Sequence, residues 1–136
     1  MENLIVEINW CDKNFECGLG HPEIGVIAVT DKSLDGVKKA FMEALDFHIE
    51  GMRADDDIIP EWLDSGNYEI SYSLSVAAIL RNAEQFTTMA AISRASGINQ
   101  KLLSNYANAV KSPRREQRLK IITGLHRIGK EFLSVC

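Results

Sequence analysis

The side chains best suited to recognise a ligand in this chain lie in residues 99–108. Most of the polar side chains in this stretch are uncharged. Asn and Gln pair with an adenine edge through a donor and an acceptor, Lys reaches guanine acceptors, and Ser suits a base or a phosphate. No acid occurs between Glu84 and Glu116. We interpret the stretch as a DNA-reading surface; the alternative is a helical hairpin with a solvated face. The candidate base-contacting residues are Asn99, Gln100, Lys101, Ser104, Asn105 and Asn108.

Basic side chains follow this stretch directly. Lys111, Arg114 and Arg115 belong to the sequence KSPRREQR. Lys and Arg neutralise backbone phosphates, and the exposed amides at a helix start also favour an anion. We expect Ser112 to cap a final helix with Pro113 at its first position. The three basic residues would then lie around the loop and the start of that helix, next to the reading helix, as phosphate contacts.

A pair of short helices must position these residues. Thr87 or Thr88 can cap the first helix, and Gly97 permits the left-handed conformation that ends it. Asn99 is a typical cap for the second helix. A helix, a glycine-containing turn and a helix are typical of the helix-turn-helix motif, in which the second helix enters the major groove of DNA. The apolar stripe expected for the final helix is Leu119, Ile122, Leu125, Ile128 and Phe132.

The preceding part of the chain has a different pattern. Apolar and polar residues alternate over residues 4–10 and 15–19, which predicts a hairpin, and residues 25–29 predict a third, more buried strand. An amphipathic helix follows with Ser33 as its N-cap, and residues 68–74 alternate again. The expected fold class is α+β. An antiparallel sheet covered on one face by the helix, followed by an all-helical domain, is the simplest packing.

Charge divides the chain at the same place. Residues 1–74 contain 16 acidic and 5 basic residues, a net charge of −11, whereas residues 75–136 contain 3 acidic and 10 basic residues, a net charge of +7. We predict two domains with these bounds. A basic domain favours nucleic acid, and an acidic one favours a basic protein. The alternative is that the two halves neutralise each other within the molecule.

Contacts with a basic protein would come from the acidic domain. Its loop contains three consecutive aspartates and a tryptophan, which is either a lid on the core or a binding anchor. The aspartates are either a solvated loop or part of a partner contact. The candidate interface residues are Glu50, Asp55, Asp56, Asp57 and Trp62.

No catalytic or metal-binding cluster is apparent. Glu7 stands alone on its strand, and consecutive carboxylates in a loop diverge, so the ligands of a two-metal nuclease are not assembled. His48 lies on an apolar helix face, and the spacing of Cys11, Cys17 and His21 is unlike that of a metal site. We expect no enzyme activity and no cofactor. A nuclease whose activity needs Glu7 or Asp12 is the lowest-ranked alternative.

The chain also contains no apolar run that is long enough to cross a membrane, and its start, MENLIVEINW, lacks the features of a signal peptide. Three cysteines do not suit a disulfide framework. We therefore expect a soluble cytoplasmic protein.

Nearly the whole sequence resembles HicB-type antitoxins of bacterial toxin–antitoxin pairs, in the variant with a C-terminal helix-turn-helix. The resemblance rests on the expected order of strands and helix, on YEISYSLSVAAILRNAE, and on ASGINQKLLSNYANAVKSPRREQRLKIITGLHRIGKEFLS. The last stretch also resembles the DNA-binding domain of phage repressors. Ser93 stands where alanine is common there, and it keeps the site small.

This resemblance implies a partial ribonuclease H-like N-terminal domain that blocks a small basic toxin of the HicA type, an mRNA-cleaving protein. It further implies a C-terminal domain that binds operator DNA and represses its own operon in the bacterial cytoplasm, with the protein acting as a homodimer or homotetramer. The alternative is a stand-alone helix-turn-helix repressor whose N-terminal domain senses a ligand or only oligomerises.

Overall fold

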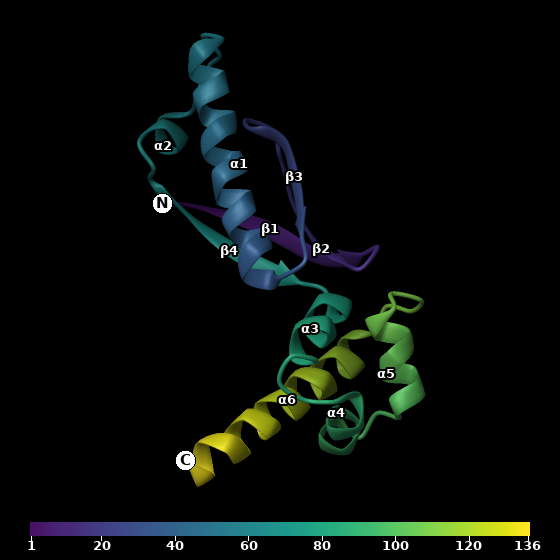
Figure 1. The fold of residues 1–136 in the computed structure, drawn as a ribbon. Helices are drawn as coiled ribbons and strands as arrows, with labels where there is room; N and C mark the ends of the chain where they lie inside the picture. Colours follow the sequence, from purple (N-terminus) through teal and green to yellow (C-terminus); the bar gives the residue numbers. More distant parts are fainter. The chain divides into compact units, whose positions relative to one another are not determined.

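The computed structural model describes residues 1–136, which form two compact units, Met1–Ser75 and Val76–Cys136. The fold is α+β: the first unit holds a four-stranded sheet and two helices, and the second holds four helices (Figure 1). None of the helices has both the length and the apolar composition needed to cross a bilayer.

The sheet is mixed, which differs from the antiparallel sheet expected from the sequence. Its strands are β1 (Glu2–Cys11), β2 (Asn14–His21), β3 (Gly25–Asp31) and β4 (Tyr68–Leu74), in the order β3-β2-β1-β4. The first three pair antiparallel, but β4 pairs parallel to β1. A helix between β3 and β4 carries the chain across to the far side of β1, and such a crossover connects strands that run in the same direction.

The expected alternation is confirmed in β1 and β2. Leu4, Val6 and Ile8 are buried, and the residues between them are exposed. Asp12 and Lys13 both have positive φ values, 50° and 63°, between the paired residues Cys11 and Asn14. Two left-handed residues match the right-handed twist of a tight hairpin.

Strand β3 is less buried than its apolar sequence predicted. Ile27 faces the core and is 6% exposed, whereas its neighbour Val26 is 79% exposed. The reason is that only one face of the sheet is covered, so the side chains of β3 that point to the other face are exposed.

Helix α1 (Leu34–Ala54) covers one face of the sheet (Figure 1). The predicted cap is confirmed, since the Ser33 hydroxyl accepts a hydrogen bond from the Gly36 amide at 2.9 Å. A short helix, α2 (Glu61–Asp64), interrupts the region that the sequence predicted to be a loop. The buried positions of α1 are Val37, Phe41, Leu45 and Ile49.

The second unit consists of α3 (Val76–Ala83), α4 (Met89–Ser96), α5 (Gln100–Ala107) and α6 (Arg115–Val135). All four helices contribute to one apolar core. Its buried residues are Val76, Leu80, Ile92, Ile98, Leu103, Tyr106, Ala107 and Ile121.

The predicted start of the last helix is wrong by two residues. Arg114 is the N-cap, with an extended backbone and no side-chain cap, in place of Ser112, and Pro113 lies before the helix. The amides of Val110 and Lys111 bond to the Asn105 carbonyl, so the chain first turns against the end of α5. It leaves that turn in an extended segment before the helix begins.

The predicted apolar stripe of α6 is also wrong in part. Leu119 and Phe132 are 63% and 61% exposed, whereas Ile121 is fully buried. A Cβ on Gly124 would lie 2.9 Å from the Ser96 backbone nitrogen, so α4 and α6 are in close contact at this glycine. The helix therefore turns the face with Ile121 and Gly124 toward α4. The sequence pattern missed this face because it was based on apolar side chains, and glycine has none.

Candidate nucleic-acid interface

Helices α4 and α5 are joined by a tight turn whose predicted signals are confirmed. The Thr88 hydroxyl accepts a hydrogen bond from the Ala91 amide at 3.1 Å and caps α4. Gly97 has a φ of 77° and ends this helix in the left-handed conformation. Asn99 Oδ1 accepts from the Leu102 amide at 2.8 Å and caps α5. Local chemistry therefore fixes where each helix begins and where the first one ends.

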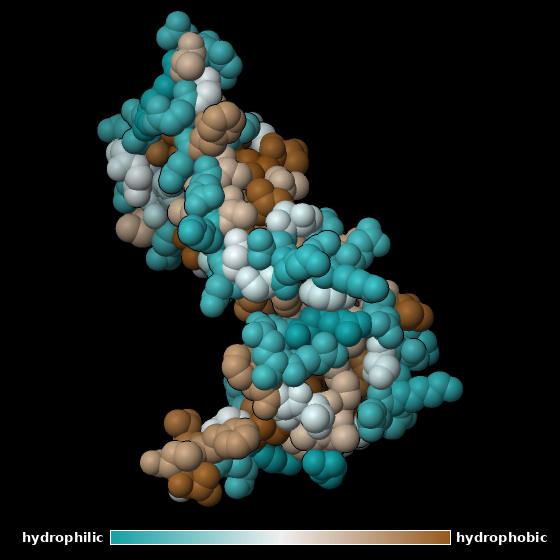
Figure 2. All heavy atoms as spheres, viewed as in Figure 1, coloured by the Kyte–Doolittle hydropathy of each residue, from teal (hydrophilic) through white to brown (hydrophobic).

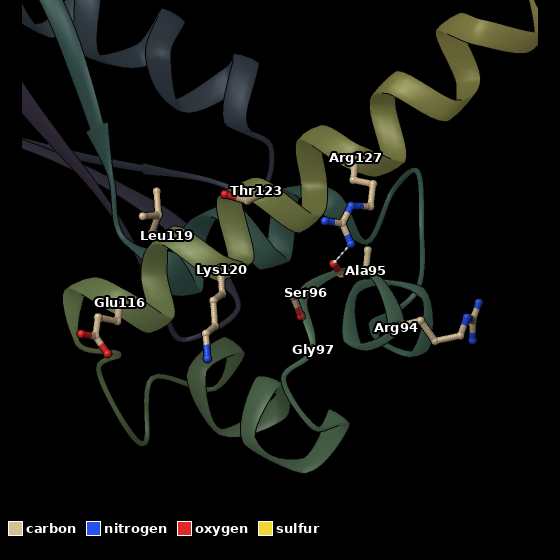
Figure 3. Close-up of a pocket in the computed structure, with 9 residues that line it drawn as sticks. All are labelled: Arg94, Ala95, Ser96, Gly97, Glu116, Leu119, Lys120, Thr123 and Arg127. Atoms are coloured by element: carbon tan, nitrogen blue, oxygen red, sulfur yellow. Dashed lines mark hydrogen bonds between the residues drawn. The ribbon is translucent and has the colours of Figure 1, made fainter.

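Side chains from other positions brace this turn. Ser93 Oγ donates to the Ile98 carbonyl at 2.6 Å, and the Gly97 amide bonds to the Ser93 carbonyl at 2.9 Å. From α6, Arg127 Nη1 donates to the Ala95 carbonyl at 3.2 Å, which is the bond drawn in Figure 3. The sequence did not predict the role of either Ser93 or Arg127, because each depends on a contact made only in the fold.

The buried and outer faces of α5 are well separated. Leu103, Tyr106 and Ala107 are buried against the core. Lys101 and Asn105 are four residues apart on the opposite side of the helix. The structure therefore brings the polar candidates together on and around one face. Asn99, Gln100, Lys101 and Asn108 are exposed, and Ser104 and Asn105 are half-buried.

Two of the six candidates also have structural partners. Asn99 uses its Oδ1 atom as the cap. Asn108 ends α5, and its side-chain oxygen accepts a hydrogen bond from Arg81, whose Nε also donates to the Ala107 carbonyl at 3.0 Å. Gln100, Lys101 and Asn105 are therefore the clearest positions at which to test recognition separately from folding.

Asn99→Ala is expected to lower the free energy of unfolding of the second unit by about 1 kcal/mol, because the Leu102 amide loses its acceptor. Asn99→Ser keeps an acceptor and should restore most of the loss. Urea unfolding followed by circular dichroism compares the two variants. Equal stability of both would show that the cap contributes nothing.

The basic residues after α5 are exposed. Lys111, Arg114 and Arg115 lie in the turn before α6 and at its start, and none of them forms an ion pair. Their charges are therefore not neutralised by neighbouring carboxylates, and they are accessible to an external anion.

A cleft of about 540 Å³ lies between the end of α4 and residues 116–127 of α6. Arg94, Lys120 and Arg127 line it, and Glu116 is its single acidic residue. In Figure 3, Lys120 points into the space beside the turn, whereas Arg94 points away from it. The sequence does not predict this cleft, because its lining residues are separated along the chain and only the packing of α4 on α6 places them around one turn.

The acidic candidates of the first unit lie around the end of α1. Glu50 pairs with Arg53, whose Nε also donates to Asp64 Oδ1 at 2.9 Å. Arg53 thus joins α1 to α2, and the adjacent Asp64 carboxylate raises its pKa. The side chains of Asp55, Asp56 and Asp57 are exposed in the following loop.

Trp62 is packed within the first unit. Its ring lies edge-on to His21, with 5.5 Å between ring centroids, and edge-on to Tyr68 at 6.3 Å. The sequence left open whether this tryptophan is a lid or an anchor, and its aromatic neighbours support the role of a lid.

The cysteine and histidine candidates do not form a ligand cluster. Cys17 is fully buried, and burial raises the pKa of its thiol to about 11. Cys11 is exposed, and the negative charge of Asp12 raises its thiol pKa. His48 is half-buried, with its Nε2 atom hydrogen-bonded to the Ile24 carbonyl. No group of three or more His, Cys, Asp or Glu side chains is close enough to hold a metal ion.

Comparison with known proteins does not assign this geometry to a family: no protein-family model, curated protein or solved structure matches the chain.

Proposed function

We propose that this protein is a HicB-type antitoxin that binds a small basic toxin through its acidic unit and represses its own operon through its basic unit. In this proposal the first unit is a non-catalytic, ribonuclease H-like binding domain. The segment from α4 to α5 is a helix-turn-helix, with α5 as the helix that reads the major groove.

The outer face of α5 is the observation that carries the proposal. It presents amide, hydroxyl and amino groups, and no acidic residue lies between Glu84 and Glu116. Base edges are read with these groups, whereas a carboxylate would be repelled by the phosphates. Unpaired basic residues at the start of α6 add the phosphate contacts that position a reading helix.

Charge supports the toxin partner. Residues 1–74 carry a net charge of −11, which is complementary to a protein that binds RNA. Such a partner would be held away from its RNA for as long as its basic surface is covered.

Oligomerisation completes the proposal, since a single small module binds DNA weakly and a dimer spans two half-sites. The end of α6 supports it. Phe132, Leu133 and Val135 are exposed there, and Figure 2 shows apolar atoms gathered at this end of the helix. A homodimer or homotetramer in the bacterial cytoplasm is the form we propose.

Fluorescence anisotropy with DNA from upstream of the gene tests the DNA-binding part. The full-length protein should bind that DNA at least about 1,000-fold more tightly than a scrambled duplex at the same salt concentration. Equal affinity for both duplexes would contradict the repressor function.

Arg114→Ala and Arg115→Ala should weaken binding to both duplexes and reduce the slope of log K against log salt by about 1 each. Both side chains are exposed and unpaired, so their loss should leave the fold intact. Lys130→Ala, an exposed cation far along α6, is the control. An unchanged slope in the two arginine variants would remove these residues from the phosphate contacts.

A further inference from the structure

Two highly exposed large apolar side chains of the first unit lie close in sequence to its acidic loop. Phe47 is 81% exposed on α1, and Ile58 is 94% exposed directly after the three aspartates. Phe47 is two residues from both Leu45 and Ile49, which are buried, and a step of two residues turns about 200° around a helix. Phe47 therefore cannot reach the core and faces away from the sheet.

A groove of about 360 Å³ runs beside this phenylalanine. We call it the Phe47 groove. Gly51, a residue of α1, forms part of the groove wall. A Cβ at this position would have no other atom within 4 Å. Glycine weakens a helix relative to alanine, and here neither packing nor a positive φ requires it. Its lining includes Phe47, His48, Gly51, Met52, Asp55 and Asp57.

The carboxylates that line the groove make its rim negatively charged. Asp55 and Asp57 lie on its rim, and the nearest base along the chain, Arg53, is already bonded to Glu50 and Asp64. A partner that covers the groove therefore has to bring Lys or Arg for the carboxylates as well as an apolar group for Phe47. Aromatic side chains dominate binding energy at such sites, and a phenylalanine face also attracts a guanidinium.

We infer that the Phe47 groove is the docking site for a basic protein, which places an apolar side chain against Phe47 and Lys or Arg side chains at Asp55 and Asp57. The identity of that protein as the toxin rests on the function proposed above. Trp62 is not an anchor in this arrangement, because its ring is packed against His21 and Tyr68.

Calorimetric titration of the full-length chain with an inactivated form of the small basic protein that the proposed function predicts beside its gene tests the inference. Phe47→Ala removes the anchor, and Gly51→Leu fills the groove with a good helix former. Each substitution should raise the Kd for the basic protein by about 10-fold or more. Emission from Trp10 and Trp62, both in Met1–Ser75, checks that this unit stays folded.

Two exposed apolar residues serve as matched controls. Phe86, 77% exposed in the second unit, and Val26, 79% exposed on the uncovered face of the sheet, should each change Kd by less than about 2-fold when replaced by alanine. Unchanged affinity in Phe47→Ala would overturn the inference while leaving the antitoxin function intact. A loss confined to Val26→Ala would place the partner on the sheet face and also overturn it.

Two further outcomes are distinguishable. If the wild-type chain does not bind the basic protein at all, the proposed function fails and the inference fails with it. If Phe47→Ala instead dissociates an oligomer of this chain alone in sedimentation experiments, the groove is occupied by a second copy and the inference is overturned.

Discussion

The double variant Gln100→Ala, Asn105→Ala is expected to lose about 2 to 6 kcal/mol of operator binding when the two contributions add. Each side chain offers a donor and an acceptor on or beside the outer face of α5, and neither is a helix cap. The loss should apply to the operator and leave binding to scrambled DNA almost unchanged, because base contacts carry specificity and phosphate contacts carry general affinity.

Anisotropy titrations with both duplexes measure this difference, and a calorimetric titration with the basic protein serves as the control for the first unit. The partner affinity should be that of the wild type. If a folded variant lost affinity for both the operator and the basic protein, the proposal that separate units bind these two partners would be contradicted. An equal loss on scrambled DNA would show that α5 makes phosphate contacts only.

Gly124→Ala is expected to destabilise the second unit by about 1 to 3 kcal/mol, although alanine is the better helix former. Its Cβ would lie 2.9 Å from both the backbone nitrogen and the Cβ of Ser96, so α4 or α6 has to shift. Ser96 immediately precedes the turn at Gly97, and the variant should therefore also weaken operator binding.

Gly129→Ala on the same helix is the matched control, because its Cβ would have no atom within 4 Å. This variant should stabilise the unit by about 0.5 to 1 kcal/mol. Hydrogen exchange of peptides from α4 to α6 measures both effects. Tryptophan emission should be the same in both variants, since both tryptophans lie in the first unit. Stabilisation by Gly124→Ala would contradict the close contact between α4 and α6.

Much of the fold was predictable because it follows from local chemistry. Ser33, Thr88 and Asn99 cap helices with their own side-chain oxygens, and Gly97 adopts the left-handed conformation that only glycine takes readily. Strand β4 matches the predicted alternation over residues 68–74. Each of these signals involves residues no more than a few positions apart.

Two of the errors have the opposite property, because they depend on contacts between distant parts of the chain. The parallel pairing of β4 with β1 depends on the crossover made by α1, and the rotation of α6 depends on Ser96 of another helix. The choice between lid and anchor that the sequence left open at Trp62 also depends on a distant residue, His21. Periodicity within one segment contains no information about such partners.

For the candidate site, the sequence predicted the chemical types along α5 but not the residues that brace the turn. Ser93 and Arg127 both donate to backbone carbonyls at the junction of α4 and α5, and only the fold brings Arg127 there. The capping role of Asn99 was predictable from its position. An alanine substitution at Asn99 would therefore change both the stability of α5 and DNA binding, so it does not separate the two effects.

The central claim is that one chain holds a protein partner and DNA through separate units. Purification of the tagged protein from its native cell at low and at high salt, with mass spectrometry of what remains bound, tests it most directly. The account predicts a stoichiometric small basic protein, encoded beside this gene and toxic when expressed alone, together with DNA that is released at high salt. Recovery of DNA without any such protein would contradict the antitoxin function and favour a stand-alone repressor.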